Sequence, residues 1–244
     1  MFTKDDVSKT AVDNYNSSTP WPQNDIWHKH TFNAEKEIVE KWLSIVSSQN
    51  TLILNAGSGG SVYNTEGTVV HLDIIEKYIK HFEKYLVGSI EEINLPAESV
   101  DVIICVGSVL NYADAQRAIS EFYRILKPTG FLILEFERSD SAEFLCTTNH
   151  GKDIFTNVYY YNGQKHLLWL YSERHIRQLL RQFRFKIVRC KRIHTLSSLL
   201  NRFGLSEAKS ALFSKLDKIV QPISYPFSHN ALFLVSKTLS IKKQ

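Results

Sequence analysis

The sequence predicts an α/β fold of the doubly wound type, in which helices cover both faces of a sheet. Two observations carry this prediction. Short, continuous apolar runs, as expected of strands buried on both faces, recur at residues 51–54, 68–72, 85–87, 100–106 and 131–136. Helical segments lie between some of these runs, at residues 74–84 and 113–126. That alternation is typical of a parallel sheet.

A polar, aromatic-rich stretch, residues 1–32, precedes this pattern. Pro20 and Pro22 prevent it from being a regular helix, so we expect an arm that is flexible or folds back. A helix is predicted from Asn33, which can cap it, because Glu35 and Glu37 then lie favourably near the positive end of its dipole. This helix should cover one face of the sheet.

The helix predicted from Asn33 is followed by a strand at residues 51–54, which runs directly into a glycine-rich turn at residues 55–61. A helix is expected between this turn and the next strand. Glycines in this place let backbone N–H groups approach a ligand at a helix N-terminus, although glycines also simply make turns. The second strand ends in Asp73, whose carboxylate can hold the hydroxyls of a ribose or can cap a helix at Ile74. Ligands of open α/β sheets bind at this carboxyl edge.

The pattern loosens beyond Asp140 through an aromatic stretch, residues 155–171. It then recovers, and we expect a helix at 172–182, a strand at 184–192, a helical segment at 196–220 and a last strand at 231–236.

Composition narrows the function classes. No apolar run approaches the roughly 20 residues that span a bilayer, and the polar N-terminus lacks an apolar signal core, so we expect no membrane span and a cytoplasmic location. The three cysteines, of which Cys105 is expected to be a small buried side chain, lie far apart and indicate neither disulfide nor metal. The net charge of +4 neither requires nor excludes an anionic partner.

Four features in order resemble the class I S-adenosylmethionine-dependent methyltransferases, with a methyltransferase type 11-like domain: residues 54–59, Asp73, residues 99–107 and residues 126–131. The resemblance implies a Rossmann-like, seven-stranded, mostly parallel sheet with an antiparallel last strand, and S-adenosylmethionine as cofactor. By position, the glycine turn lies against the methionine part, Asp73 takes the ribose hydroxyls, and Ser89 and Ile90 flank the adenine. The cofactor residues implied are Asn55, Ala56, Gly57, Ser58, Gly59, Asp73, Ile74, Ser89, Ile90, Val106 and Gly107.

The chain departs from the family pattern at three positions. Asn55 replaces an acid, Ser61 replaces the third glycine, and Ser89 replaces an Asp near the adenine amino group. Because neutral groups lose charge-assisted hydrogen bonds, weaker cofactor binding is expected. An NAD-dependent dehydrogenase shares the glycine turn, but Val62 occupies its third glycine position and no second nucleotide-binding half follows residue 140.

The expected organisation is one methyltransferase domain over residues 1–244. It comprises an arm or lid at 1–32, a cofactor-binding half at 33–140, and a substrate-covering insert with the C-terminal strands at 141–244. The expected reaction is methyl transfer to an O, N or C atom of a small-molecule acceptor, which suits a covered pocket. Two alternatives stay open: an RNA-modifying methyltransferase, favoured by the basic run at 177–192, and a catalytically degenerate partner protein, favoured by Asn55 and Ser89.

A catalytic base is optional, because the sulfonium methyl is already electrophilic and mainly needs an aligned acceptor. An acceptor that must lose a proton needs a side chain at the pocket mouth to take it. The candidates are His28, His30, Asn111, Tyr112, Glu137 and His166, each of which can equally be structural. Three aromatic residues of the arm can cover the cofactor: Tyr15, Trp21 and Trp27.

Overall fold

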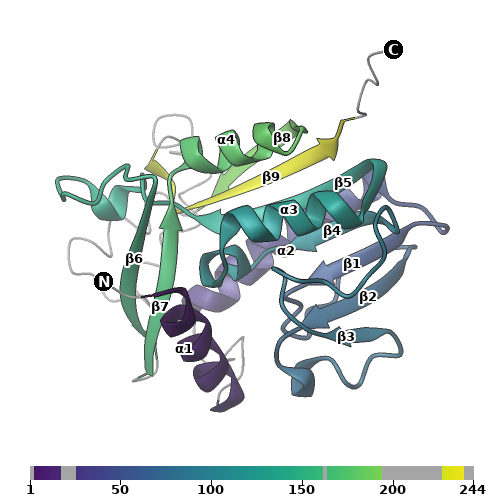
Figure 1. The fold of residues 1–244 in the computed structure, drawn as a ribbon, viewed down its shortest axis with the longest axis horizontal. Coiled ribbons are helices and arrows are strands. Elements are labelled where there is room, and N and C mark those ends of the chain that lie inside the picture. The colour runs from purple at the N-terminus through teal and green to yellow at the C-terminus, as the bar shows by residue number, and fades with distance from the viewer. Residues whose placement is uncertain (1–2, 18–25, 162–163, 194–226, 239–244) are drawn as a thin grey trace.

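A seven-stranded sheet forms the centre of the computed structural model, which describes residues 3–17, 26–161, 164–193 and 227–238 (Figure 1). Its strands are β1 (Leu52–Ala56), β2 (Thr68–Asp73), β3 (Tyr85–Val87), β4 (Val100–Cys105), β5 (Leu126–Glu137), β8 (Phe185–Ile193) and β9 (Asn230–Lys237). Their order is β3-β2-β1-β4-β5-β9-β8. The first five are parallel, whereas β9 is antiparallel to both of its neighbours. The predicted fold class, including the antiparallel last strand, is confirmed.

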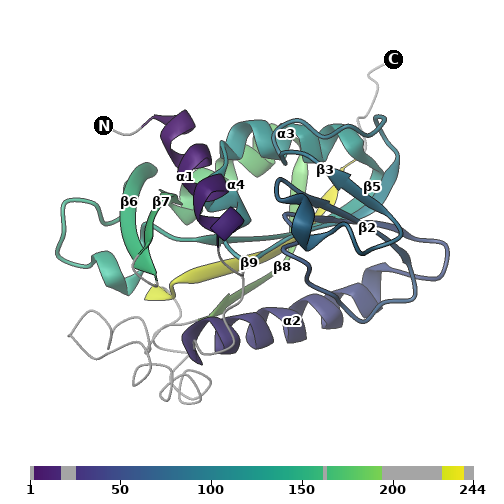
Figure 2. The ribbon, with the colours of Figure 1, turned by 90° about the horizontal axis from the view of Figure 1, so that it is seen from below.

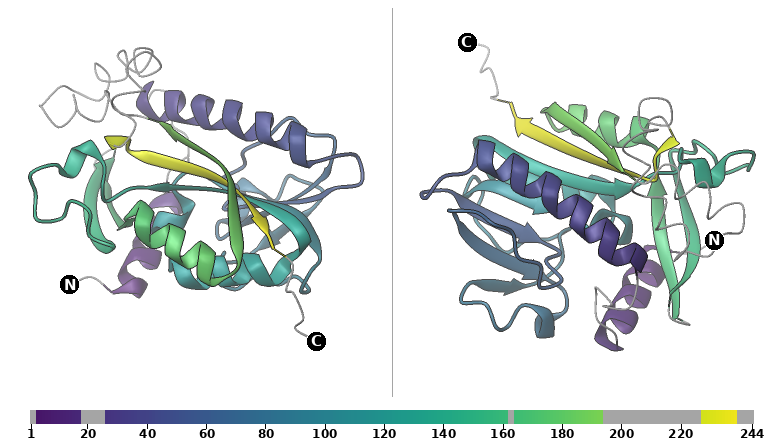
Figure 3. Two further views of the ribbon diagram at one scale, coloured as in Figure 1. Left: turned by 90° about the horizontal axis from the view of Figure 1, so that it is seen from above. Right: turned by 180° about the vertical axis from the view of Figure 1, so that it is seen from behind.

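Helices cover both faces of the sheet (Figure 2). The view from behind in Figure 3 shows α2 (Ile26–Val46) lying across one face, and α3 (Ala115–Ile125) and α4 (Glu173–Gln182) cover the other. Strand β4 shows why both are needed, because its side chains alternate between the faces. Val102 and Ile104 belong to the core that contains α2, and Ile103 and Cys105 to the core that contains α3. Cys105 is fully buried, as predicted.

Two elements extend past the carboxyl edge of the sheet. A hairpin of β6 (Ile154–Tyr161) and β7 (Gln164–Tyr171) occupies the aromatic stretch. Helix α1 (Lys4–Ser17) packs beside it, and the Asn14 side-chain amide donates to the Lys165 carbonyl at 2.7 Å. The arm therefore contains a helix that the sequence analysis did not predict. The Pro20 to Pro22 segment and the predicted helical segment at 196–220 lie outside the described residues.

Helices α3 and α4 begin close to where the sequence predicts them, because each has a side-chain cap. An oxygen of Asp114 accepts the N–H groups of Gln116 and Arg117, and the Ser172 hydroxyl accepts that of His175. Within the described part of the chain, no helix is both long enough and apolar enough to cross a membrane.

Three helix predictions were wrong. Helix α2 begins at Ile26, so Asn33 lies inside it and does not cap it. No helix follows the glycine turn before β2, and residues 74–84 contain only the short 3-10 helix η1 (Glu76–Tyr78). Tertiary contacts explain the last difference, because the Phe82 ring stacks on His71 of β2 with centroids 3.5 Å apart and the His71 N–H donates to the Lys84 carbonyl at 3.0 Å.

Candidate active site

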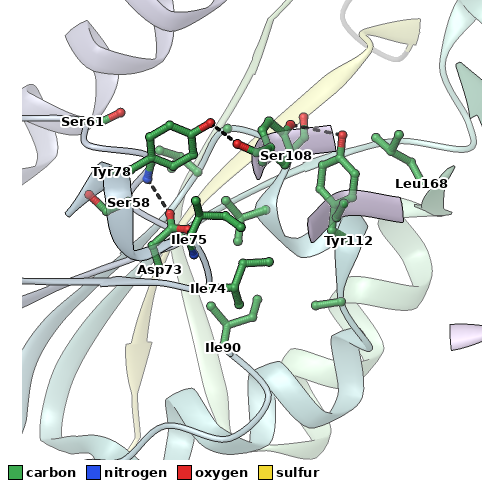
Figure 4. A pocket seen from close by; sticks show the side chains of 18 of the residues that line it. Ser58, Ser61, Asp73, Ile74, Ile75, Tyr78, Ile90, Ser108, Tyr112 and Leu168 are labelled. Atoms are coloured by element: carbon green, nitrogen blue, oxygen red, sulfur yellow. Dashed lines mark hydrogen bonds between the residues drawn. The ribbon is translucent and has the colours of Figure 1, made fainter. Parts of the chain in front are cut away.

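A cavity of about 410 Å³ lies at the carboxyl edge of the sheet, under α1 and β7. Figure 4 shows Asp73, Ile74 and Ile90 towards one end of it and Tyr112 and Leu168 towards the other. The implied cofactor residues that line it are Gly57, Ser58, Gly59, Asp73, Ile74, Ser89, Ile90, Val106 and Gly107. The remaining two, Asn55 and Ala56, are buried in β1 and do not line the cavity.

The glycine turn is held against the end of β2. The N–H groups of Gly57 and Ser58 donate to the Leu72 carbonyl at 2.8 and 2.9 Å, and that of Gly59 donates to Asp73 Oδ2 at 2.7 Å. The expectation that these donors would face a ligand at a helix N-terminus was wrong, because no helix follows and β2 already occupies all three. These residues shape the cavity wall without supplying N–H donors to it.

Gly57 is required by both conformation and space. Its φ is +71°, in the left-handed region that favours glycine. A Cβ atom added there would lie 2.3 Å from Val109 Cγ1 and 2.5 Å from Cγ2. Val109 starts the short 3-10 helix η2 (Val109–Tyr112), so the turn and η2 pack together closely.

Asn55 has a structural role for which a carboxylate is unsuited. Its Nδ2 donates to the Ser61 carbonyl at 3.0 Å and to Ser58 Oγ at 3.2 Å, while Ser58 Oγ pairs with His71 Nδ1 at 2.7 Å. An Asp at this position would have no donor for the carbonyl. Burial, followed by the charge of His81, lowers the pKa of His71 to about 4 and keeps its ring neutral near pH 7.

Asp73 links the glycine turn to the chain after β2 and also lines the cavity. Burial raises the pKa of its carboxyl, and hydrogen bonds from backbone N–H groups, including those of Gly59 and Ile75, act in the opposite direction. The Gly59 and Ile75 N–H groups bind one oxygen each and the Ile74 N–H acts on the same carboxyl, whereas a carboxylate has about four acceptor sites. Asp73 therefore retains acceptor capacity for ligand hydroxyls. Beside it, Ile74 and Ile90 offer apolar surface for a flat ring.

A group of carboxylates lies at the ends of β5 and β9. Glu135 accepts from the Ser108 N–H at 2.6 Å and from Asn230 Nδ2 at 2.7 Å, and Glu137 accepts from the Ser108 hydroxyl at 2.7 Å. Burial raises the pKa of Glu135 to about 7 despite these bonds. His229 lies between two acids, with Nε2 at 3.4 Å from Glu137 and Nδ1 at 3.3 Å from Glu143.

Three aromatic side chains meet on the wall formed by α1, η2 and β7. The Tyr15 hydroxyl donates to the Tyr112 hydroxyl at 3.2 Å, which pairs with His166 Nδ1 at 3.1 Å, and all three residues line the cavity. Asn111 behaves differently. It is fully buried, and its amide binds the backbone of Glu137 and Trp169, so it positions η2 and does not face the cavity. The side chains of His28, His30, Trp21 and Trp27 lie outside the described residues.

The model of the methyltransferase domain family matches residues 52–134, which run from β1 into β5 and supply the glycine turn, Asp73 and the ends of β2 to β4. Residues 52–134 carry the methyltransferase domain of the class I S-adenosylmethionine-dependent type. The resemblance based on the sequence motifs is thereby confirmed.

Relatives of this chain are distant. An uncharacterised methyltransferase of Schizosaccharomyces pombe is 28% identical over 55% of this chain and 53% of its own length. A methyltransferase-like protein of the same yeast is 23% identical over 84% of this chain and 88% of its own. The crystal structure of Burkholderia thailandensis 1,6-didemethyltoxoflavin-N1-methyltransferase, with 1,6-didemethyltoxoflavin and S-adenosylhomocysteine bound, is 13% identical. It aligns with a TM-score of 0.59 over 98% of this chain and 92% of that one, which supports the fold.

The cavity residues that were not predicted from the sequence include Glu35 on α2, and His229 and Asn230 at the start of β9. Glu35 was interpreted only as a partner of the helix dipole, and His229 and Asn230 were not considered. The signal for the last two was the antiparallel direction of β9, which starts at the edge where the parallel strands end. The signal for Glu35 was weaker, since it depended on placing the start of α2 correctly.

Proposed function

We propose that this chain binds S-adenosylmethionine across the ends of β1, β2 and β4 and transfers its methyl group to a small-molecule acceptor. The observation that carries the proposal is the joint placement of the glycine turn, Asp73 and Ile90 on one cavity wall. Asp73 would hold the ribose hydroxyls, and Ile74, Ser89 and Ile90 would surround the adenine. Val106 and Gly107, at the end of β4, would complete the wall.

When bound, the cofactor supplies an electrophilic methyl on a sulfonium, which an acceptor lone pair attacks as the carbon–sulfur bond breaks. The protein has to orient the acceptor and exclude water. Helix α1 and the β6–β7 hairpin would do this as the lid and the substrate-covering insert, in a single domain over residues 1–244. An acceptor that carries a proton would give it to His166, whose Nδ1 is held by Tyr112.

Two features favour a small molecule over RNA. Among the described residues that line the cavity, four are acidic (Glu35, Asp73, Glu91 and Glu137) and none is Lys or Arg, whereas RNA binding depends on phosphate contacts from basic side chains. Members of the basic run have internal partners: Arg177 and Arg192 reach Glu173 at 2.7 and 2.6 Å. We further propose action in the cytoplasm, as expected from the sequence.

The degenerate-partner alternative loses one of its two arguments, because Asn55 braces the turn and does not line the cavity. Ser89 stays on the wall as a neutral residue, with its hydroxyl accepting from the Glu91 N–H at 3.2 Å. Cofactor binding weaker than that of a relative with Asp at this position is therefore still expected.

Calorimetric titration with S-adenosylmethionine and S-adenosylhomocysteine tests the proposal. A separate titration with NAD tests the dehydrogenase alternative. We expect both adenosyl ligands to bind and NAD not to bind. Asp73→Asn should weaken both by at least about tenfold, since a charge-assisted acceptor is lost. The matched control is Asp13→Asn, at an exposed position of α1. Absence of binding by the unaltered protein would refute the proposal and favour the degenerate partner.

A further inference from the structure

A second part of the cavity, which we name the acidic recess, is lined by Glu35, Glu137 and Asn230. It adjoins the implied cofactor wall at Gly107 and extends from there, because β5 and β9, which carry Glu137 and Asn230, are on the other side of β4 from β1 and β2. Glu35 comes from α2, and the charges of Glu135 and Glu137 act on it, so it belongs to the same recess. The recess is where an acceptor would sit if the cofactor occupies the ends of β1, β2 and β4.

Glu35 is the unusual member of the acidic recess. Only 2% of the residue is exposed, and neither carboxyl oxygen has a hydrogen-bond partner among the residues that the structure describes. Burial and then the charges of Glu135 and Glu137 raise the pKa of this carboxyl well above its ordinary value. A buried carboxyl without a partner costs stability. Side chains that carry such a cost and face a cavity are typical of binding sites.

The acidic recess contains buried oxygen atoms that can accept hydrogen bonds and have no donor among the described residues. Besides the two oxygens of Glu35, Asn230 Oδ1 is buried without a hydrogen-bond partner in the described part of the chain, since Asn230 uses its Nδ2 on Glu135. His229, the cationic group beside the recess, is engaged with Glu137 and Glu143. An N–H-rich cation in the recess can donate to oxygens of this kind and balance the charge of Glu35.

We propose that the acidic recess binds a protonated nitrogen of the methyl acceptor, an ammonium or amidinium group, with Glu35 as its counter-ion and Asn230 Oδ1 as a second acceptor. This inference rests on the proposed function, because it assigns the acceptor side of the same cavity. Acceptors with a basic nitrogen are then preferred over neutral or anionic molecules of the same shape.

The test uses the full chain saturated with S-adenosylhomocysteine and two pairs of probes. Each pair compares a cation with a neutral analogue: benzamidinium with benzamide, and benzylammonium with benzyl alcohol. Calorimetry at constant ionic strength should show tighter binding of at least one cation than of its neutral partner. Glu35→Gln, which keeps the shape and removes the charge, should weaken that cation by at least about tenfold and leave the neutral partner unchanged. The matched control is Glu37→Gln, an exposed position on the same helix.

Two further readouts separate the alternatives. The inference predicts that Glu35→Gln leaves S-adenosylhomocysteine affinity unchanged and melts at or above the temperature of the unaltered protein. Lost S-adenosylhomocysteine affinity would assign the recess to the ammonium of the cofactor, and a lower melting temperature would assign Glu35 a structural role; either result overturns the inference. Equal binding of cations and neutral partners overturns it too. The proposed function fails separately, if the unaltered protein does not bind S-adenosylhomocysteine.

Discussion

Substitutions at Gly57 and Gly151 separate the energetic cost of backbone strain from the cost of steric overlap. Gly57→Ala places a Cβ atom 2.3 Å from Val109 Cγ1 on a backbone with φ of +71°. Gly151 has the same φ of +71°, but nothing lies within 4 Å of its added Cβ. The substitution Gly151→Ala therefore reports the strain of the left-handed conformation alone, and Gly57→Ala reports that strain together with the overlap.

The left-handed conformation costs an L-residue about 1 to 2 kcal/mol, and overpacking a closely fitted site costs about 1 to 3 kcal/mol. We expect Gly151→Ala to lower the free energy of unfolding by the first amount and Gly57→Ala by the sum, about 2 to 5 kcal/mol. Urea denaturation followed by circular dichroism measures both.

Val109 provides the check on the cause. In a Val109→Ala background the two γ carbons are absent, so the difference between the two glycine variants should shrink. Equal destabilisation by Gly57→Ala and Gly151→Ala in the unaltered background would refute the steric argument.

Two further predictions concern the walls of the cavity. Although burial lowers the pKa of His229, the hydrogen bonds and charges of Glu137 and Glu143 raise it to about 10. A group whose pKa is higher in the folded state stabilises the folded protein fully at pH values below its unfolded pKa, which is about 6.5 for histidine. The stability advantage over His229→Gln should thus fall between about pH 6.5 and 10, and an advantage independent of pH, measured by denaturation, would contradict it. Tyr78→Phe removes the hydrogen bond from the Tyr78 hydroxyl to the Tyr15 carbonyl of α1. That bond contributes about 1 kcal/mol, so hydrogen exchange of the backbone amides in α1 should accelerate about fivefold. The control is Tyr160→Phe, at an exposed position. Unchanged exchange would show that other contacts hold α1.

The parts of the fold that the sequence predicts well are those with local, repeated signals. Buried strands such as β4 are mostly apolar, and α3 carries its own cap at Asp114. Asp73 and the glycine turn were found because residue type and position after a strand suffice to place them at one edge of the sheet.

The parts that the sequence did not predict depend on tertiary contacts. Residues 74–84 have a helical pattern, yet Phe82 stacks on His71 with ring centroids 3.5 Å apart. This contact joins groups whose proximity only the folded sheet creates. Glu35 shows the same limit, because a dipole partner and a cavity residue look alike in a sequence when the helix start is misplaced.

The position of β9 has a consequence for how the protein is made. This strand is the last of the described strands to leave the ribosome, yet it lies between β5 and β8 and pairs with both. Strand β8, synthesised earlier, has no sheet partner until β9 arrives, so closing the sheet requires contacts between distant parts of the chain, which form slowly. Asn230 and His229 enter with β9, and a nascent chain therefore carries the glycine turn and Asp73 well before the cavity is complete. Chains arrested before residue 229 should be able to form the cofactor wall but not the acidic recess.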